Sequence, residues 1–110
     1  MEQVLIVMTN LPNAQAASTL ASALVEARLA ACVNLLPAVQ SVYRWQGKVE
    51  RATEMTLLIK TTQRHYAALE AAIRAAHPYD LPEVIALPVT AGLPSYLQWV
   101  DAETTPEHDA

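Results

Sequence analysis

Residues 39–61 read VQSVYRWQGKVERATEMTLLIKT, two extended runs on either side of a short break at Gln46-Gly47. In the second run, Met55, Leu57 and Ile59 alternate with residues of mixed polarity. This two-residue period is typical of a β-strand that buries one face. A glycine-bearing pair between two such runs is typical of a hairpin. The stretch therefore predicts a β-hairpin whose tip lies at Gln46-Gly47.

One strand and one helix are expected before the hairpin. Val4–Met8 is a continuous apolar run, which predicts a strand covered on both faces. Asn13 then precedes a helical apolar pattern and is the candidate N-cap. We expect this helix to end near Leu29 or Ala30.

The same pair of elements is expected after the hairpin, in the order helix and strand. Thr62 is the candidate N-cap of a helix that must stop at His77, because Pro78 disfavours the helical region for the residue before it. Val84–Leu87 is a second short apolar run and predicts a buried strand. Pro88 places that strand at or near a sheet edge.

This order of elements predicts an α/β (α+β) fold, a ferredoxin-like βαββαβ sandwich with both helices on one face of the sheet. An extra C-terminal helix is expected after Gly92, with one apolar face made of Leu93, Tyr96, Leu97 and Val100. Residues 1–102 are expected to form one domain. Residues 103–110 carry no apolar anchor and are expected to form a flexible tail.

The composition restricts the class of protein. Of the 110 residues 53% are hydrophobic and only 16% are charged, so apolar surface is expected to be hidden in contacts between subunits. The net charge of −4 argues against nucleic acid or an anionic membrane as a partner. The single cysteine, Cys32, cannot form an internal disulfide, and Met1-Glu2-Gln3 lacks the basic start of a signal peptide. A soluble cytoplasmic protein is expected.

The block from His77 to Glu83, HPYDLPE, holds a histidine, a tyrosine and two carboxylates in a proline-stiffened connection. His77 can be a metal ligand or a proton-handling group. It can equally be a helix C-terminal histidine that interacts with the helix dipole. Cys32 lies in apolar surroundings at the entry to a strand, which suits an inert core thiol as well as a ligand.

A second set of candidates lies on the hairpin. Tyr43 and Trp45 share a face near its tip, where they can pack within the chain or across a subunit boundary. Glu54 and Lys60 share a face of the return strand, either as solvated charges or as groups that reach a ligand. They lie about 20 Å apart along one strand, so Lys60 is expected to find a carboxylate on another strand or subunit, with Glu83 as the candidate.

No catalytic constellation is recognisable in the sequence. The two glycines, Gly47 and Gly92, cannot build a phosphate-binding loop or a dinucleotide fingerprint. There is no Cys-x-x-Cys, no pair of histidines at metal spacing on one helix, and no serine in a nucleophile-elbow context. A protein that is not an enzyme is expected.

Several short motifs, in this order and spacing, resemble those of CutA, the divalent-cation tolerance protein family. They are Ala31-Cys32-Val33-Asn34, Ser41 to Gly47, Ile59-Lys60-Thr61, His77-Pro78-Tyr79, Pro82-Glu83 and Tyr96-Leu97-x-Trp99. The likeness runs from about Val4 to Trp99. It implies a ferredoxin-like subunit in a tight homotrimer, similar in architecture to the PII signalling proteins. It also implies a role in tolerance to copper and other divalent cations, without an established catalytic activity.

The resemblance also points to particular metal ligands. Some members of the family bind copper through a cysteine after the first strand and a His-His pair before Pro-Tyr, and the corresponding positions here are Met8, Ala76 and His77. A thioether favours Cu(I). Copper, or another divalent cation, is therefore expected to use His77 as its imidazole ligand, with Met8 or Cys32 as the sulfur partner.

The sequence is compatible with two functions. The first is a metal-responsive trimer in cation tolerance. The second is a PII-like interaction module that binds an unknown small ligand between subunits and changes its contacts with a protein partner. The cleft of such a module would be lined by Tyr43, Trp45, Glu54, Lys60 and Tyr79, with Glu83 as the partner of Lys60.

Overall fold

The computed structural model describes residues 2–105, which form one four-stranded antiparallel sheet and three α-helices. In chain order the elements are β1 (Val4–Leu11), α1 (Ala14–Glu26), β2 (Cys32–Trp45), β3 (Lys48–Thr62), the short 3₁₀ helix η1 (Gln63–His65), α2 (Tyr66–Ala76), β4 (Ile85–Pro88) and α3 (Pro94–Glu103). The strand order is β2-β3-β1-β4. This is the predicted ferredoxin-like arrangement with its extra C-terminal helix.

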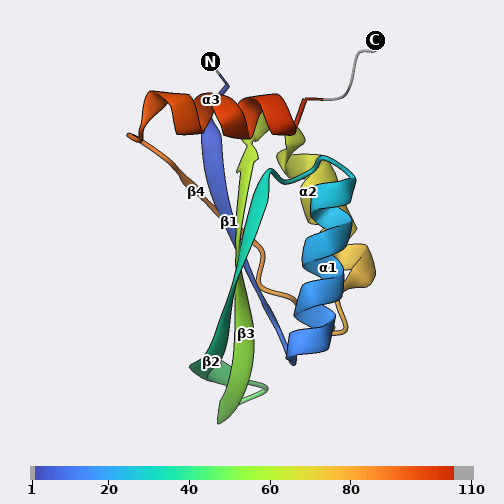
Figure 1. The fold of residues 1–110 in the computed structure, drawn as a ribbon. Coiled ribbons are helices and arrows are strands. Elements are labelled where there is room, and N and C mark those ends of the chain that lie inside the picture. Colours follow the sequence, from blue (N-terminus) through green and yellow to red (C-terminus); the bar gives the residue numbers. More distant parts are fainter. Residues whose placement is uncertain (1, 106–110) are drawn as a thin grey trace.

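The α1 and α2 helices cover one face of the sheet, and α3 lies across its end, near the start of β1 (Figure 1). The core between the sheet and the two helices is mainly apolar, with the buried threonines Thr9 and Thr61 beside it. Its completely buried members include Val7, Leu57, Ile59, Leu69 and Ile73. No helix within residues 2–105 is long and apolar enough to cross a membrane.

The predicted hairpin is confirmed, with Trp45 paired to Lys48 across a two-residue turn. Gln46 and Gly47 have φ angles of 50° and 82°, the left-handed conformations that a type I′ turn requires. The strands on both sides are longer than predicted. They form an arm that extends beyond the helices and makes the molecule 50 Å long (Figure 1).

The arm changes direction at a β-bulge in β2. The pairing of β2 with β3 is regular up to Leu36 and resumes at Val39. Between them, Pro37 is followed by Ala38 at a φ of 59°. The bulge lies on an edge strand of the sheet, because β2 has a hydrogen-bonded neighbour on one side only.

The helix boundaries follow from local capping. The predicted N-cap of α1 is confirmed: the Asn13 side chain accepts a 2.8 Å hydrogen bond from the backbone N–H of Ala16. Thr62 was expected to cap the second helix, but its hydroxyl makes no capping hydrogen bond. The chain instead enters α2 through η1. The helix α2 ends before His77 as predicted, whereas α1 ends at Glu26, short of the expected Leu29.

The second face of the sheet, which we call the open face, is covered within residues 2–105 only at its end, where α3 lies. Two cross-strand rows define it by register: Cys32, Lys60, Ile6 and Leu87 in one row, and Asn34, Leu58, Met8 and Ile85 in the next. The prediction that β1 is covered on both faces was therefore wrong for a single chain, since Ile6 and Met8 are only half-buried. The predicted burial of β4 was also wrong, although its place at the sheet edge is confirmed.

The C-terminal helix differs from its prediction in a similar way. Of its expected apolar face only Val100 is fully buried, and Leu93 and Tyr96 are exposed. Ordered packing also extends past the boundary expected at residue 103, because Thr104 is fully buried and its hydroxyl donates to the carbonyl oxygen of Val100. The remainder of the expected tail, residues 106–110, lies outside the described residues.

Candidate functional site

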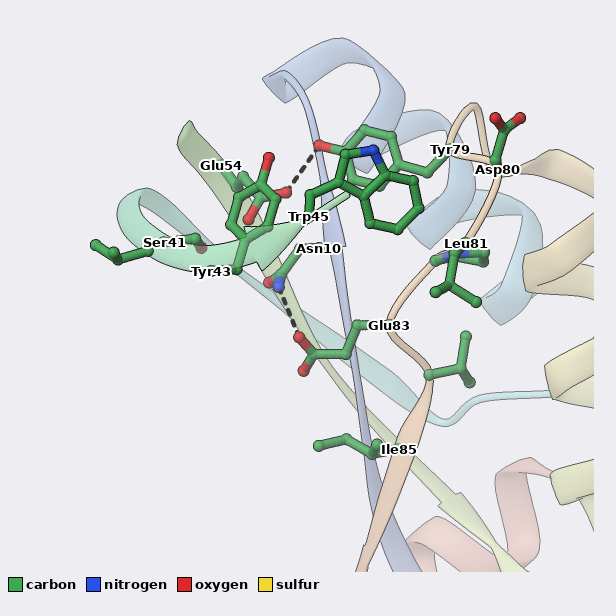
Figure 2. A pocket seen from close by; sticks show the side chains of 13 residues that line it. Asn10, Ser41, Tyr43, Trp45, Glu54, Tyr79, Asp80, Leu81, Glu83 and Ile85 are labelled. Atoms are coloured by element: carbon green, nitrogen blue, oxygen red, sulfur yellow. Dashed lines mark hydrogen bonds between the residues drawn. The ribbon is translucent and has the colours of Figure 1, made fainter. Parts of the chain in front are cut away.

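A cavity of about 890 Å³ lies between the hairpin arm and the connection that follows α2 (Figure 2). Its volume is in the usual range of small-molecule sites. Three segments build it: the end of β1, the outer half of the hairpin, and residues 79–85. The residues that line it are Asn10, Ser41, Val42, Tyr43, Trp45, Glu54, Tyr79, Asp80, Leu81, Pro82, Glu83, Val84 and Ile85.

The hydrogen bond between Tyr79 and Glu54 spans the cavity wall. The phenol donates to Oε2 of Glu54 over 2.8 Å, and the Glu54 residue is only 8% exposed. Burial raises the pKa of Tyr79, and the hydrogen bond to Glu54, the Glu54 charge and the nearby Tyr43 raise it further. The Tyr79 phenol is therefore a neutral donor at neutral pH.

His77 holds the Tyr79 segment in place. Its Nε2 lies 2.7 Å from the carbonyl oxygen of Asn10, and its Nδ1 accepts a 3.2 Å hydrogen bond from the backbone N–H of Tyr79. Because a carbonyl only accepts, Nε2 carries the proton and donates. The ring also lies 4.7 Å from that of Tyr79, centroid to centroid. His77 therefore joins the end of α2 to β1, and neither ring nitrogen has a free lone pair.

Asn10 is a site residue that the sequence interpretation missed. Its Oδ1 accepts a 2.6 Å hydrogen bond from the Thr56 hydroxyl, its Nδ2 donates to Glu83 over 3.0 Å, and its backbone carbonyl holds His77. One residue thus connects β3, the connection after α2 and the end of that helix. No sequence signal singled it out, because an asparagine soon after an apolar run such as Val4–Met8 is usual at a turn.

Five of the six predicted cleft residues line this one cavity: Tyr43, Trp45, Glu54, Tyr79 and Glu83. Lys60 does not. Its ammonium donates to Oδ1 of Asn34 on the neighbouring strand. Glu83, the expected partner of Lys60, accepts from Asn10 instead, so the predicted pairing of Lys60 with Glu83 is not made within the chain.

The three predicted metal ligands do not meet within one chain. Met8 and Cys32 both lie on the open face, but β3 separates their strands, which puts them about 10 Å apart across the sheet. His77 lies on the helix side, at the end of α2, with both nitrogens engaged. Within residues 2–105 no group of three or more His, Cys, Asp or Glu side chains is arranged to hold a metal ion. A copper centre therefore does not fit the residues of one chain alone.

The fold and the cavity define a small ferredoxin-like protein with a ligand-sized cleft beneath a long β-hairpin. The chain belongs to the CutA1 divalent ion tolerance protein family, whose family model matches residues 5–103. The resemblance seen in the short motifs is thereby confirmed.

Relatives from distant organisms agree with this assignment. The chain is 46% identical over 99 residues to the divalent-cation tolerance protein CutA of Thermus thermophilus, covering 90% of this chain and 96% of the relative. It is 45% identical to the chloroplastic protein CutA of Arabidopsis thaliana, with 91% of this chain and 55% of that longer protein covered. The chain thus spans about half the length of that plant relative.

Solved structures confirm the fold at the level of the whole chain. The crystal structure of CutA1 from Oryza sativa is similar with a TM-score of 0.90 at 42% identity, covering 96% of each chain. The structure of a CutA protein from Archaeoglobus fulgidus, described as periplasmic, gives 0.87 at 34% identity over 94% of this chain and 99% of that one.

Proposed function

We propose that this chain acts in tolerance to divalent cations as a homotrimeric, non-catalytic binding protein of the cytoplasm. The observation that carries the proposal is the cavity between the hairpin arm and residues 79–85. It brings a buried carboxylate and three aromatic rings together, which suits binding. No nucleophile beside a base accompanies them among the lining residues.

The open face supports the homotrimer. Leu36, Ile85 and Leu87 are 39%, 48% and 49% exposed in the single chain and lie beside half-buried apolar neighbours. An exposed face that is largely apolar, as this one is apart from Lys60 and Asn34, is typical of a subunit interface. Light scattering at micromolar concentration should give three times the 12.0 kDa of one chain, and a mass near 12.0 kDa would refute the trimer.

Copper is the cation to test first, because the Met8 thioether and the Cys32 thiol are soft ligands. Both lie on the open face, so neighbouring copies in a trimer could complete a site that one chain cannot form. His77 could join such a site only by giving up its hydrogen bond to Asn10 or to Tyr79.

Titration of Cu(I) and Cu(II) into wild type, Met8→Leu, Cys32→Ser and His77→Ala tests this assignment. Loss of Cu(I) binding in either sulfur variant, with His77→Ala unchanged, supports a site on the open face. Loss in His77→Ala alone, in protein that circular dichroism shows to be folded, assigns the metal to His77 instead. Unchanged affinity in all three variants removes copper from these residues.

A second candidate is a PII-like module, favoured by the position of the cavity directly under the hairpin arm. A ligand that contacts Tyr43 and Trp45 on the arm and Tyr79 on the body would couple the two parts. Hydrogen exchange of the arm with and without a bound ligand measures that coupling.

The cytoplasmic location rests on the single cysteine and is tested by cell fractionation, since relatives are described as chloroplastic and periplasmic.

A further inference from the structure

We propose that the cavity binds a small organic cation of the alkylammonium class. The inference rests on the proposed function only in taking this cavity as the ligand site. The family assignment names divalent ions and does not specify a ligand of this kind.

The lining of the cavity is negatively charged. Three carboxylates line it, from Glu54, Asp80 and Glu83, and none of its lining residues is a lysine, arginine or histidine. Within residues 2–105 the ion pairs involve other carboxylates, those of Glu2, Asp101 and Glu103. Among the described residues no cationic side chain pairs with these three carboxylates, and this negative charge disfavours an anionic ligand.

Glu54 is the most constrained of these carboxylates. It is 8% exposed, and its Oε2 accepts from the neutral phenol of Tyr79. Its Oε1 accepts no hydrogen bond from the residues that the structure describes. A nearly buried carboxylate whose only donor is neutral attracts a positive group strongly, since charge interactions strengthen away from water.

Three aromatic rings also line the cavity. Tyr43, Trp45 and Tyr79 line the cavity with Glu54, and in Figure 2 the Tyr79 hydroxyl points to the Glu54 carboxylate while the Asp80 carboxylate points away from Tyr43. Aromatic faces attract cations through the ring quadrupole, and quaternary ammonium groups are commonly bound this way. The rings come from the arm and from the body, so a cation between them contacts both.

The cavity suits a cation larger than a metal ion. The carboxylates are not grouped to coordinate a metal ion, as no cluster of three metal-binding side chains occurs within residues 2–105. The cavity of about 890 Å³ also exposes apolar side chains, among them Val42 and Leu81. A cation that carries its own alkyl groups matches this combination better than a small hydrated ion.

The test compares choline with 3,3-dimethyl-1-butanol, which has the same shape but a carbon atom in place of the charged nitrogen. Calorimetry on the full chain in its own assembly should show choline binding about tenfold more tightly than the neutral alcohol. Trp45→Leu and Asp80→Asn should each weaken choline binding several-fold. Trp99→Leu and Glu26→Gln serve as matched controls outside the cavity and should leave it unchanged.

Glu54→Gln should weaken choline binding most, and its folding is checked by circular dichroism. Asp80 is exposed, so Asp80→Asn keeps the test valid if Glu54→Gln unfolds. Equal binding of choline and the alcohol, absence of saturable binding, or indifference to Trp45→Leu and Asp80→Asn would overturn the inference. The trimer mass and the copper titration are separate measurements, so failure here leaves the proposed function standing.

Discussion

Tyr79 and Glu54 are 25 residues apart in the sequence and are joined by a 2.8 Å hydrogen bond between the phenol oxygen and Oε2. The bond connects the segment after α2 to the middle of β3. It closes one wall of the cavity with a buried carboxylate. This contact gives the first prediction.

Tyr79→Phe should lower the free energy of unfolding by about 1–3 kcal/mol, because it leaves a nearly buried carboxylate without its donor. Tyr43→Phe is the matched control: Tyr43 is 45% exposed and its hydroxyl makes no hydrogen bond within residues 2–105, so the free energy of unfolding should change by close to zero. Urea unfolding followed by circular dichroism measures both. Equal effects of the two variants would contradict the role given to the bond.

Alkaline pH should destabilise the protein partly through Tyr79. Burial and the contact with Glu54 raise the pKa of this phenol in the folded state, whereas in the unfolded chain it is about 10. Above about pH 10 the unfolded state therefore binds fewer protons than the folded state, and stability falls as pH rises. Below that pH this group contributes no slope.

Urea midpoints between pH 8 and pH 11 should therefore fall less steeply in Tyr79→Phe than in wild type. The slope should not vanish, since the pKa of Tyr66 and that of Tyr96 are also raised. Parallel curves for the two proteins would show that Tyr79 does not carry the effect.

Leu87→Asp should break the assembly while leaving the subunit core intact. Leu87 is 49% exposed in the single chain, where such a change costs little, but a charge on the open face would oppose burial between copies. Val25→Asp is the control, on a similarly exposed position of α1. Light scattering should show a smaller particle for Leu87→Asp only. An unchanged mass would place the interface elsewhere.

Gly47→Ala should cost about 1–2 kcal/mol, since the φ of 82° penalises a Cβ. No atom lies within 4 Å of where that Cβ would stand, so the loss would come from the backbone alone. Gly47→Asn should lower the free energy of unfolding by less than Gly47→Ala does, because asparagine tolerates left-handed conformations. Thermal melting compares the two variants, and equal losses would count against backbone strain as the cause.

Local signals predicted the fold well. The Gln46-Gly47 turn, the Asn13 cap and the helix stop at His77 each depend on a few adjacent residues, and all three are confirmed. Thr62 failed as a cap because its hydroxyl is buried, without a hydrogen-bond partner.

Contacts between distant segments were harder to predict. Lys60 lies one strand away from Asn34 in the sheet register, and only that register shows the amide to be its partner. Asn10 acquired its role because three segments meet at the end of β1. An apolar pattern also does not show whether a strand is buried within its own chain, and β4 is exposed in the single chain although its sequence is apolar.

The bulge at Pro37 and Ala38 has a consequence for solubility at high concentration. An uninterrupted 14-residue edge strand offers a row of free backbone groups on which strands of other molecules could add without limit. Proline has no N–H to donate there, and the left-handed Ala38 turns the chain out of line. The bulge therefore restricts strand addition to short stretches on either side, so the arm can remain long with less risk of seeding fibrils.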